Sequence, residues 1–313
     1  MARAFVFPGQ GSQAVGMGQE LAQAFPLARQ VFEEVDDALS QHLSRLMFEG
    51  PEEELRLTEN AQPALMAVSL AVVRVLEQEA GLDLADKGEL VAGHSLGEYS
   101  ALAAVGAFEV AQAARLLKRR GQAMQEAVPV GEGAMAALLG LELDAAAEVA
   151  GEAAQGQVCA PANDNAPGQV VVSGHREAVE RAVELAAGRG ARKSVLLPVS
   201  APFHCSLMAP AAEAMAQALE EMPPQAPRLP LVSNVTAEAT TEPESIRYLL
   251  VQQVTDMVRW RESVLFMKQQ DIDTLIELGS GKVLTGLTRR IDRELTAIAV
   301  NGPAGIEELQ KSL

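Results

Sequence analysis

Residues 88–101 read Gly-Glu-Leu-Val-Ala-Gly-His-Ser-Leu-Gly-Glu-Tyr-Ser-Ala, and this stretch decides the fold of the chain. The apolar run Leu90–Ala92 predicts a buried strand, and the apolar residues Tyr99–Ala107 predict a helix. Between them, Ser95 lies in the pattern Gly-x-Ser-x-Gly, which is typical of a nucleophile elbow. A helix that starts at Ser95 would direct its free N–H groups at a developing oxyanion. A glycine-rich turn without catalytic function has the same pattern, so the motif alone leaves both interpretations open.

The composition indicates a globular protein with a large core, because 48% of the 313 residues are apolar and 21% are charged. This length suits one large domain or two smaller ones. The net charge of −17 excludes a nucleic-acid-binding protein, which needs a basic surface. The longest apolar run, near Ala64–Val73, is too short to cross a membrane.

We expect a cytoplasmic protein without a bound metal or cofactor. The N-terminus lacks the basic region, apolar segment and cleavage site of a signal peptide. Two cysteines, Cys159 and Cys205, do not make a disulfide framework, which fits a reducing compartment. The four histidines and two cysteines show no metal-ligand spacing.

Strands and helices alternate through both ends of the chain, which predicts a hydrolase-like α/β domain with a parallel sheet at its core. The strand Ala4–Phe7 runs into a turn-rich loop, Pro8–Gln13, and such loops line the ligand crevice of open α/β sheets. A plain glycine loop would look the same. A buried helix is expected to start at Asn60-Ala61-Gln62-Pro63. Further strands are expected at 229–235, 274–278 and 296–300, and helical segments at 18–46 and 246–268.

The middle of the chain has a different order of predicted strands and helices. From residue 131 to residue 198 the order of predicted elements is strand, helix, strand, strand, helix, strand, which is the ferredoxin-like βαββαβ plan. We therefore expect a small ferredoxin-like domain at residues 130–198, inserted into a discontinuous catalytic domain that comprises residues 1–129 and 199–313.

Arg120 is the most informative charged residue of the predicted helix 109–127. In helical projection it lies within the apolar arc with Leu116 and Leu117, whereas Lys118 and Arg119 point to the other side. A buried guanidinium needs a partner, because unpaired burial of a charge costs several kcal/mol. The partner is either an internal carboxylate or the carboxylate of a ligand. From the pattern alone, the internal ion pair is the commoner arrangement.

Two loops have weaker patterns. His204 follows Pro202 and Phe203, and a lone histidine in a loop is more often structural than catalytic. The Gly279–Lys282 loop resembles a phosphate cradle but lacks the spacing of either nucleotide-binding fingerprint, so we interpret it as a tight strand-to-helix turn.

The elbow, the Phe-Pro-Gly-Gln-Gly-Ser-Gln opening, the Arg120 helix and the Pro-Phe-His segment occur together in this order. In this combination the chain resembles the malonyl-CoA:acyl carrier protein transacylases of fatty acid synthesis. The resemblance extends over essentially the whole chain, including the Glu-Leu-Gly-Ser-Gly-Lys-Val-Leu segment at 277–284. It implies transfer of a malonyl group from coenzyme A to the phosphopantetheine thiol of acyl carrier protein, with ping-pong kinetics and the coenzyme A thioester as substrate.

The resemblance also implies roles for single residues. Ser95 would be the nucleophile that forms a malonyl ester, and His204 would be the general base that accepts its proton. The backbone carbonyl of Gln253 would orient His204 in place of an acid. The oxyanion hole would comprise Leu96 and Gln10, and Arg120 would bind the free malonyl carboxylate through a bidentate pair. Family positions near the pocket with less defined roles match Gln62, His94, Asn163 and Asn165.

The resemblance bears on selectivity and on the carrier protein as well. An aromatic residue at Phe203 would favour malonyl over branched methylmalonyl groups, although it could simply pack the loop. Because carrier proteins are acidic and this chain is too, docking needs a local basic patch. Its candidates are Arg189, Arg192, Lys193, Lys282, Arg289 and Arg290, although such a charge run is usually just a solvated face.

Two other functions remain open at this stage. A serine thioesterase or esterase would need only the elbow and would have no use for a cation that binds a charged acyl group. A carrier-protein binding module without catalytic activity would not need Ser95 together with His204.

Overall fold

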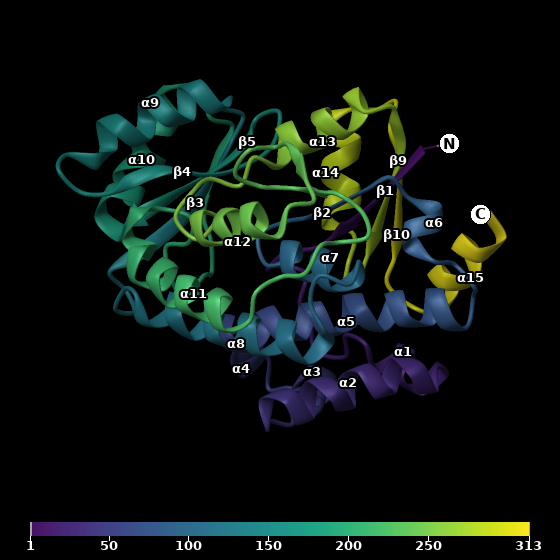
Figure 1. Ribbon diagram of the computed structural model, residues 1–313. Helices are drawn as coiled ribbons and strands as arrows, with labels where there is room; N and C mark the ends of the chain where they lie inside the picture. Colours follow the sequence, from purple (N-terminus) through teal and green to yellow (C-terminus); the bar gives the residue numbers. More distant parts are fainter. Residues whose placement is uncertain (1, 313) are drawn as a thin grey trace.

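The computed structural model describes residues 2–312 and contains two β-sheets that lie side by side (Figure 1). The larger sheet has six strands in the order β10-β9-β1-β2-β7-β8, all parallel except β8. This arrangement confirms the α/β fold class. Its strands are β1 (Ala2–Phe7), β2 (Leu90–Gly93), β7 (Leu231–Val232), β8 (Ala239–Thr240), β9 (Ile272–Leu278) and β10 (Thr296–Val300).

Side chains alternate between the two faces of the large sheet, and each face has its own apolar core. On β1, Ala4 and Val6 pack with Trp260 on the face covered by α13 (Trp260–Gln269) and α14 (Val283–Ile291). Phe5 and Phe7 point to the other face and join a larger core formed with α5 (Thr58–Gln78) and α7 (Gly97–Ala104). Helices on both faces explain why most side chains of the parallel strands are apolar.

A layer of helices lies beneath the sheets in Figure 1, with α5 at its centre. Helix α5 is buried from Asn60 to Val73, which confirms the expectation of a buried helix. The remaining helices are α1 (Gln19–Ala24), α2 (Pro26–Leu39), α3 (Leu43–Glu49), α4 (Glu52–Arg56), α6 (Leu84–Lys87), α8 (Val110–Glu126), α11 (Ala209–Glu221), α12 (Pro243–Gln252) and α15 (Pro303–Ser312), with a short 3₁₀ helix η1 (Ser206–Met208).

The smaller sheet is antiparallel, in the order β4-β5-β3-β6, with helices α9 and α10 packed on it. The element order β3-α9-β4-β5-α10-β6 and this strand order are those of a ferredoxin-like fold, as predicted. The domain limits at 129/130 and 198/199 stay a prediction. The elements are β3 (Gly133–Leu139), α9 (Leu143–Ala154), β4 (Cys159–Ala166), β5 (Gln169–His175), α10 (Arg176–Gly188) and β6 (Lys193–Leu196).

Several predicted boundaries were wrong. The helical segment predicted at 18–46 consists of α1, α2 and the start of α3, because the chain is extended at Phe25 and left-handed at Ser40, with φ of 49°. Helix α5 starts at Thr58, two residues before the predicted start, and Pro63 lies inside it. The strand predicted at 229–235 contains only Leu231 and Val232, since residues 233–237 form a turn.

Two more differences concern the segments that flank the site. The helix after the elbow begins at Gly97 and not at Ser95, because Ser95 has a left-handed φ of 53° that a helix cannot include. It ends at Ala104, three residues before the predicted end. Residues 246–268 form parts of two helices, α12 and α13, which are separated by the irregular segment 253–259. Within residues 2–312, no helix is long and apolar enough to span a bilayer.

Candidate active site

Ser95 lies on a sharp turn between β2 and α7, and two glycines make this turn possible. A Cβ atom on Gly93 would lie 1.9 Å from the carbonyl carbon of Gly97. A Cβ atom on Gly97 would lie 2.3 Å from the carbonyl oxygen of Phe7 on the neighbouring strand. Neither distance is possible for a real side chain, so both positions require glycine. The Gly-x-Ser-x-Gly spacing therefore has a structural cause at this turn.

His204 lies against Ser95, although 109 residues separate them. The His204 Nε2 atom is 2.8 Å from the Ser95 hydroxyl oxygen, and its Nδ1 atom is 2.8 Å from the backbone carbonyl oxygen of Gln253. A carbonyl oxygen can only accept, so the ring proton is on Nδ1 and Nε2 is free to accept the serine proton. This geometry fits the base arrangement that the resemblance implies, with a carbonyl in place of an acid.

The surroundings of His204 keep its imidazole neutral. The residue is 5% exposed and has a left-handed φ of 57°. Burial lowers the pKa of His204 to about 3, and the positive charge of Arg120 acts in the same direction. A neutral imidazole can act as a general base over the whole physiological pH range.

Arg120 is buried beside the nucleophile and has no direct acidic partner. Its Nη1 atom donates to Gln62 Oε1 at 2.7 Å, and its Nη2 atom donates to Gln253 Oε1 at 2.8 Å and to Ser95 Oγ at 3.1 Å. Among residues 2–312, no carboxylate forms an ion pair with it, and its buried Nε atom has no hydrogen-bond partner. The internal ion pair that the pattern alone favours is thus absent from the part of the chain that is described. The cation remains available to a ligand carboxylate.

Two residues that line the cavity with Ser95 have backbone N–H groups without an acceptor in the described chain. Leu96 follows Ser95 at the start of α7, and Gln10 lies in the loop after β1. The neighbouring N–H groups of Ser95 and Gly97 donate to Asn234 Oδ1 and to His94 O. In contrast, within residues 2–312 the N–H groups of Leu96 and Gln10 have no acceptor. This pair fits the oxyanion hole that the resemblance implies.

These groups line a cavity of about 470 Å³ between the two sheets. Strands β3 and β5 of the small sheet supply an apolar wall with Met135, Ala137 and Val171. Every predicted site residue except Gln253 lines this cavity, namely Gln10, Gln62, His94, Ser95, Leu96, Arg120, Asn163, Asn165, Phe203 and His204. Gln253 lies behind them and reaches the site through the hydrogen bonds given above.

The β4 strand brings two asparagines from the small sheet to the elbow. Asn165 Oδ1 lies 2.8 Å from His94 Nε2, so this histidine binds β4 rather than the nucleophile. Asn163 is buried and pairs in parallel with Val258. Burial lowers the pKa of His94, which therefore donates to Asn165 as a neutral ring. These contacts join the small sheet to the large one at the floor of the cavity.

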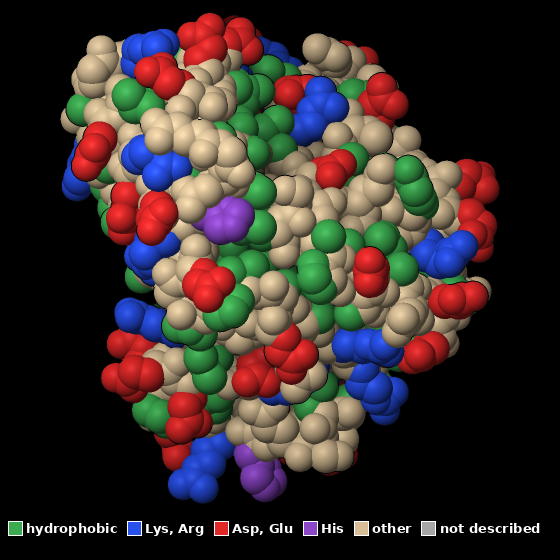
Figure 2. Space-filling view, turned by 90° about the vertical axis from the view of Figure 1, so that its left-hand side faces the viewer, with side chains coloured by type: hydrophobic (Ala, Val, Ile, Leu, Met, Phe, Trp, Pro, Cys, Tyr) green, Lys and Arg blue, Asp and Glu red, His purple; other side chains and the backbone are tan. Residues whose placement is uncertain are grey.

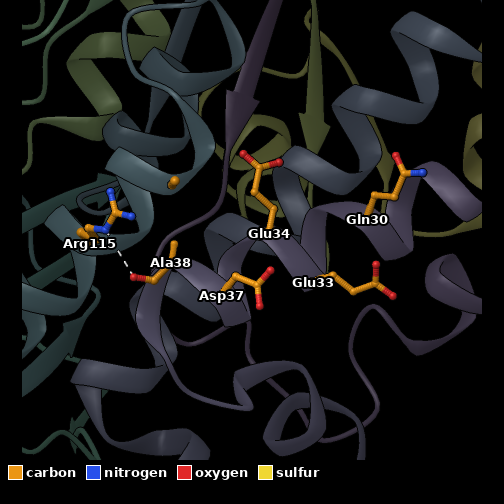
Figure 3. A pocket seen from close by; sticks show the side chains of 7 residues that line it. Gln30, Glu33, Glu34, Asp37, Ala38 and Arg115 are labelled. Carbon is orange, nitrogen blue, oxygen red and sulfur yellow. Dashed lines mark hydrogen bonds between the residues drawn. The ribbon is translucent and has the colours of Figure 1, made fainter.

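A second hollow of about 470 Å³ lies between α2 and α8 (Figure 3). Its acidic side chains Glu33, Glu34 and Asp37 come from α2, and Arg115 Nε donates to the carbonyl oxygen of Ala38 across it. It has no serine, cysteine or histidine in its lining, so it lacks the paired serine and histidine of the other cavity. Within residues 2–312, no cluster of three or more His, Cys, Asp or Glu side chains could hold a metal ion. The cavity at Ser95 is thus the candidate active site.

The predicted basic residues lie at the surface, and they differ in how they are paired. Arg189 forms ion pairs with Glu148 and Glu152. Arg192, Lys193, Lys282 and Arg290 are exposed and form no ion pair within the described residues. Figure 2 shows acidic and basic side chains interspersed on the face that carries α9 and α10, without a continuous basic patch.

Sequence reasoning missed two buried residues that organise the site. Glu98 accepts hydrogen bonds from the Asn234 backbone N–H and from Gln253 Nε2, each at 2.5 Å. Asn234 accepts from the Ser95 N–H at 2.7 Å and donates to Gly93 O at 2.7 Å. A signal for Glu98 was present, because it is an acid in an otherwise apolar helix. No sequence pattern indicated Asn234, because it lies far from Ser95 in the sequence and contacts the elbow only in the folded protein.

The chain is similar to known proteins over nearly its whole length. Residues 4–300 match the acyl transferase domain family. The chain is 48% identical to the malonyl CoA-acyl carrier protein transacylase of Escherichia coli strain K12, over 97% of each protein. The crystal structure of an acyl-carrier-protein-S-malonyltransferase from Bartonella henselae has a TM-score of 0.97 at 55% identity and covers 100% of this chain, which in turn covers 99% of that structure.

Another solved structure holds a malonyl-transacylase in complex with a type II PKS acyl-carrier protein. It has a TM-score of 0.97 at 46% identity, with complete coverage of both chains. The chain therefore belongs to the acyl transferase domain family and, within it, to the malonyl CoA-acyl carrier protein transacylases.

Proposed function

We propose that the protein transfers a malonyl group from coenzyme A to the phosphopantetheine thiol of acyl carrier protein through a malonyl ester of Ser95. The observation that carries this proposal is the position of Arg120. A buried cation without an ion-pair partner in the described chain lies 3.1 Å from the hydroxyl oxygen of the nucleophile. A hydrolase of uncharged esters would have no use for this costly arrangement, whereas an acyl group that ends in a carboxylate would compensate the charge.

The first half-reaction forms the ester. The Ser95 oxygen attacks the thioester carbonyl carbon while its proton passes to His204 Nε2. The N–H groups of Leu96 and Gln10 stabilise the negative oxygen of the tetrahedral intermediate. When this intermediate collapses, the carbon–sulfur bond breaks and His204 returns the proton to the sulfur of coenzyme A.

The second half-reaction repeats these steps in reverse, with the carrier-protein thiol as the attacking group. His204 accepts the thiol proton, the sulfur attacks the ester carbonyl, and Ser95 leaves with the proton from His204. Throughout, Arg120 binds the malonyl carboxylate with two parallel hydrogen bonds. Gln62 and Gln253 hold the guanidinium in place by accepting hydrogen bonds from its Nη1 and Nη2 atoms.

Intact-protein mass spectrometry tests this proposal. After incubation with malonyl-CoA, the protein is expected to gain the mass of one malonyl group on Ser95, and addition of holo acyl carrier protein is expected to remove it. Loss of the group to water before the carrier is added would favour a thioesterase. No mass gain at all would favour a carrier-protein binding module and would contradict a catalytic function.

Phe203 is proposed to set the size limit for the acyl group, because it is 7% exposed and lines the cavity next to the base. The same mass measurement with an equimolar mixture of malonyl-CoA and methylmalonyl-CoA tests this role. The malonyl adduct should predominate in the wild type, and Phe203→Ala should bring the two adducts closer to equal. Equal adducts in the wild type would contradict the role of Phe203.

Carrier docking is proposed to use Arg192 and Lys193 at the start of β6, Lys282 next to the cavity, and Arg290 in the last turn of α14. These four residues are exposed cations free of ion pairs in the described chain, and Val283 on the cavity lining follows Lys282 directly. Arg189 and Arg289 are weaker candidates, because Arg189 is bound to two glutamates and Arg289 donates to Ala297 O. The same proposal places the protein in the cytoplasm with its substrates.

Reversal of Arg192 and Lys193 to glutamate is expected to raise the KM for carrier protein by roughly tenfold and to leave the KM for malonyl-CoA unchanged, because rim charges act mainly on association. Steady-state kinetics at low and high salt measure both constants. A matched control reverses Arg45 and Lys311, two exposed cations on α3 and α15. If both pairs of reversals raise the KM for the carrier equally, net charge and not this patch is responsible.

A further inference from the structure

Glu98 is a fully buried acid whose two oxygens both accept hydrogen bonds. One oxygen accepts from the Asn234 backbone N–H and the other from Gln253 Nε2. It lies in the first turn of α7 and forms no ion pair within residues 2–312. It does not line the cavity, so it cannot touch a substrate. The mechanism given above does not use it.

The side-chain amide of Gln253 connects Glu98 to Arg120. Its Nε2 atom donates to Glu98 at 2.5 Å and to the Ser95 carbonyl oxygen at 3.0 Å, and its Oε1 atom accepts from Arg120 Nη2 at 2.8 Å. An amide has one donor end and one acceptor end. As long as Glu98 requires the donor end, the acceptor end must face the guanidinium.

We infer that Glu98 is a positioning residue: it fixes the orientation of the Gln253 amide, through which Arg120 is held in the geometry that selects a carboxylated acyl group. This inference deepens the proposed function and rests on it. Among the described residues, Arg120 has two other acceptors, Gln62 Oε1 and Ser95 Oγ. With the amide reversed, an N–H group would face the guanidinium, donor against donor, and the cation would shift away from the malonyl carboxylate.

The contact of Glu98 with Asn234 has a different consequence from its contact with Gln253, so the effects of the two contacts can be measured separately. Through the Asn234 backbone, Glu98 supports the side chain that binds the Ser95 N–H. Loss of this Asn234 contact, which we call the Asn234 branch, alters the nucleophile itself and slows transfer of every acyl group alike. A change in the Gln253 branch acts through Arg120 and slows only acyl groups that carry a carboxylate. The ratio of malonyl to acetyl transfer therefore reports the Gln253 branch alone.

Glutamine is the informative replacement at position 98, because it has the same size and only one acceptor oxygen. If that oxygen serves Asn234, the new amide nitrogen faces Gln253 and demands its acceptor end. Burial raises the pKa of Glu98 to about 8, with the hydrogen bonds from Asn234 and Gln253 acting against this. In the observed geometry both oxygens of Glu98 face N–H donors, from Asn234 and from Gln253, so the carboxyl group acts as an acceptor at both ends. An amide has only one acceptor and cannot replace it in both contacts.

The experiment compares single-turnover acylation of Ser95 by malonyl-CoA and by acetyl-CoA in four proteins: wild type, Glu98→Gln, Gln253→Ala and the double variant. We expect Glu98→Gln to lower the malonyl-to-acetyl rate ratio about tenfold or more, as for a lost hydrogen bond to a charged group. Gln253→Ala keeps its backbone carbonyl for His204 and should lower the ratio similarly. The double variant should be no worse than Gln253→Ala, because Glu98 acts through that amide.

Glu277→Gln is the matched control. Glu277 is also fully buried, and its carboxylate accepts from the N–H groups of Leu284 and Thr285 at the start of α14, away from Arg120. The Glu277→Gln variant should leave the malonyl-to-acetyl rate ratio unchanged. A ratio unchanged in Glu98→Gln, or effects of Glu98→Gln and Gln253→Ala that simply multiply in the double variant, would overturn the inference.

Two features keep the test decisive. If Glu98→Gln is not folded by circular dichroism, Gln253→Ala decides alone, and a wild-type ratio in that variant overturns the inference. The wild type separates this inference from the proposed function. If the wild type forms no malonyl ester, the proposed function fails. If it forms the ester and the ratio does not respond to the variants, only the role of Glu98 fails.

Discussion

Replacement of Arg120 by alanine is expected to lower kcat/KM for malonyl-CoA by roughly a hundredfold to several thousandfold, while acetyl transfer falls much less. The reason is the burial of the guanidinium, which is 1% exposed and forms no ion pair with a described residue. Truncation of one partner in a buried charge pair costs about 3–5 kcal/mol, and each 1.4 kcal/mol corresponds to a factor of ten. Rates of thiol release from malonyl-CoA and acetyl-CoA under single-turnover conditions measure both effects.

Arg119 offers a matched control for this experiment, because it is the neighbouring arginine on the same helix. Its guanidinium is at the surface and pairs with Glu221 at 2.9 Å. Arg119→Ala should leave both rates within about twofold of the wild type, as exposed ion pairs contribute little. Equal losses of malonyl and acetyl transfer in Arg120→Ala would mean that Arg120 supports the structure and does not recognise the acyl carboxylate.

The local parts of this site could be predicted from sequence, because each depends on neighbours in the chain. The strand, turn and glycines around Ser95 lie within one short segment, and their spacing is dictated by the contacts of Gly93 and Gly97. The burial of Arg120 follows from helical periodicity alone. The βαββαβ order of the small sheet could likewise be predicted, because each of its strands and helices has its own local pattern of apolar residues.

The long-range parts were accessible only through resemblance or not at all. His204 and the Gln253 carbonyl meet Ser95 because α12 ends at Gln252 and the chain then turns toward the elbow. Residues 246–268 were predicted to be largely helical around Gln253, and this prediction missed the break. Glu98 and Asn234 are 136 residues apart, and nothing in either segment indicates that a backbone N–H will need that carboxylate. Such pairings arise from the packing of whole elements.

Replacement of His204 by alanine is the second change with a large expected effect. The rate of Ser95 acylation should fall by roughly 10²–10⁴-fold for malonyl and acetyl groups alike, which is the range for loss of a general base. The equal loss distinguishes it from Arg120→Ala, where only the charged acyl group is strongly affected. His42→Ala is the control, because His42 precedes α3 and does not line the cavity. A selective loss of malonyl transfer in His204→Ala would contradict its role as the base.

The pH dependence of the wild type follows from the same residue. Only neutral His204 can accept the serine proton, and its pKa lies at about 3. The acylation rate should therefore be constant from about pH 8 to pH 5 and fall only as the pH approaches 3. Because Arg120 contributes to the low pKa, its removal should move this fall to higher pH. A fall centred near the ordinary histidine value of 6.5 would mean that the imidazole is exposed to water.

Protein stability should respond to acid before catalysis does, and the sign follows from proton binding. In the unfolded chain His204 takes up a proton as the pH falls below 6.5, whereas in the folded protein it stays neutral down to about 3. The unfolded state then binds more protons, so the free energy of unfolding falls by about 1.4 kcal/mol for each pH unit from this histidine. Urea titrations between pH 6 and pH 4 give the free energy of unfolding of the wild type and of His204→Ala. The slope of this free energy against pH should differ between the two proteins by that amount. Identical slopes would mean that position 204 does not bury a neutral base. For the same reason, the acylation rates at low pH must be measured by pH jump, before acid unfolding sets in, so that they report the protonation of His204.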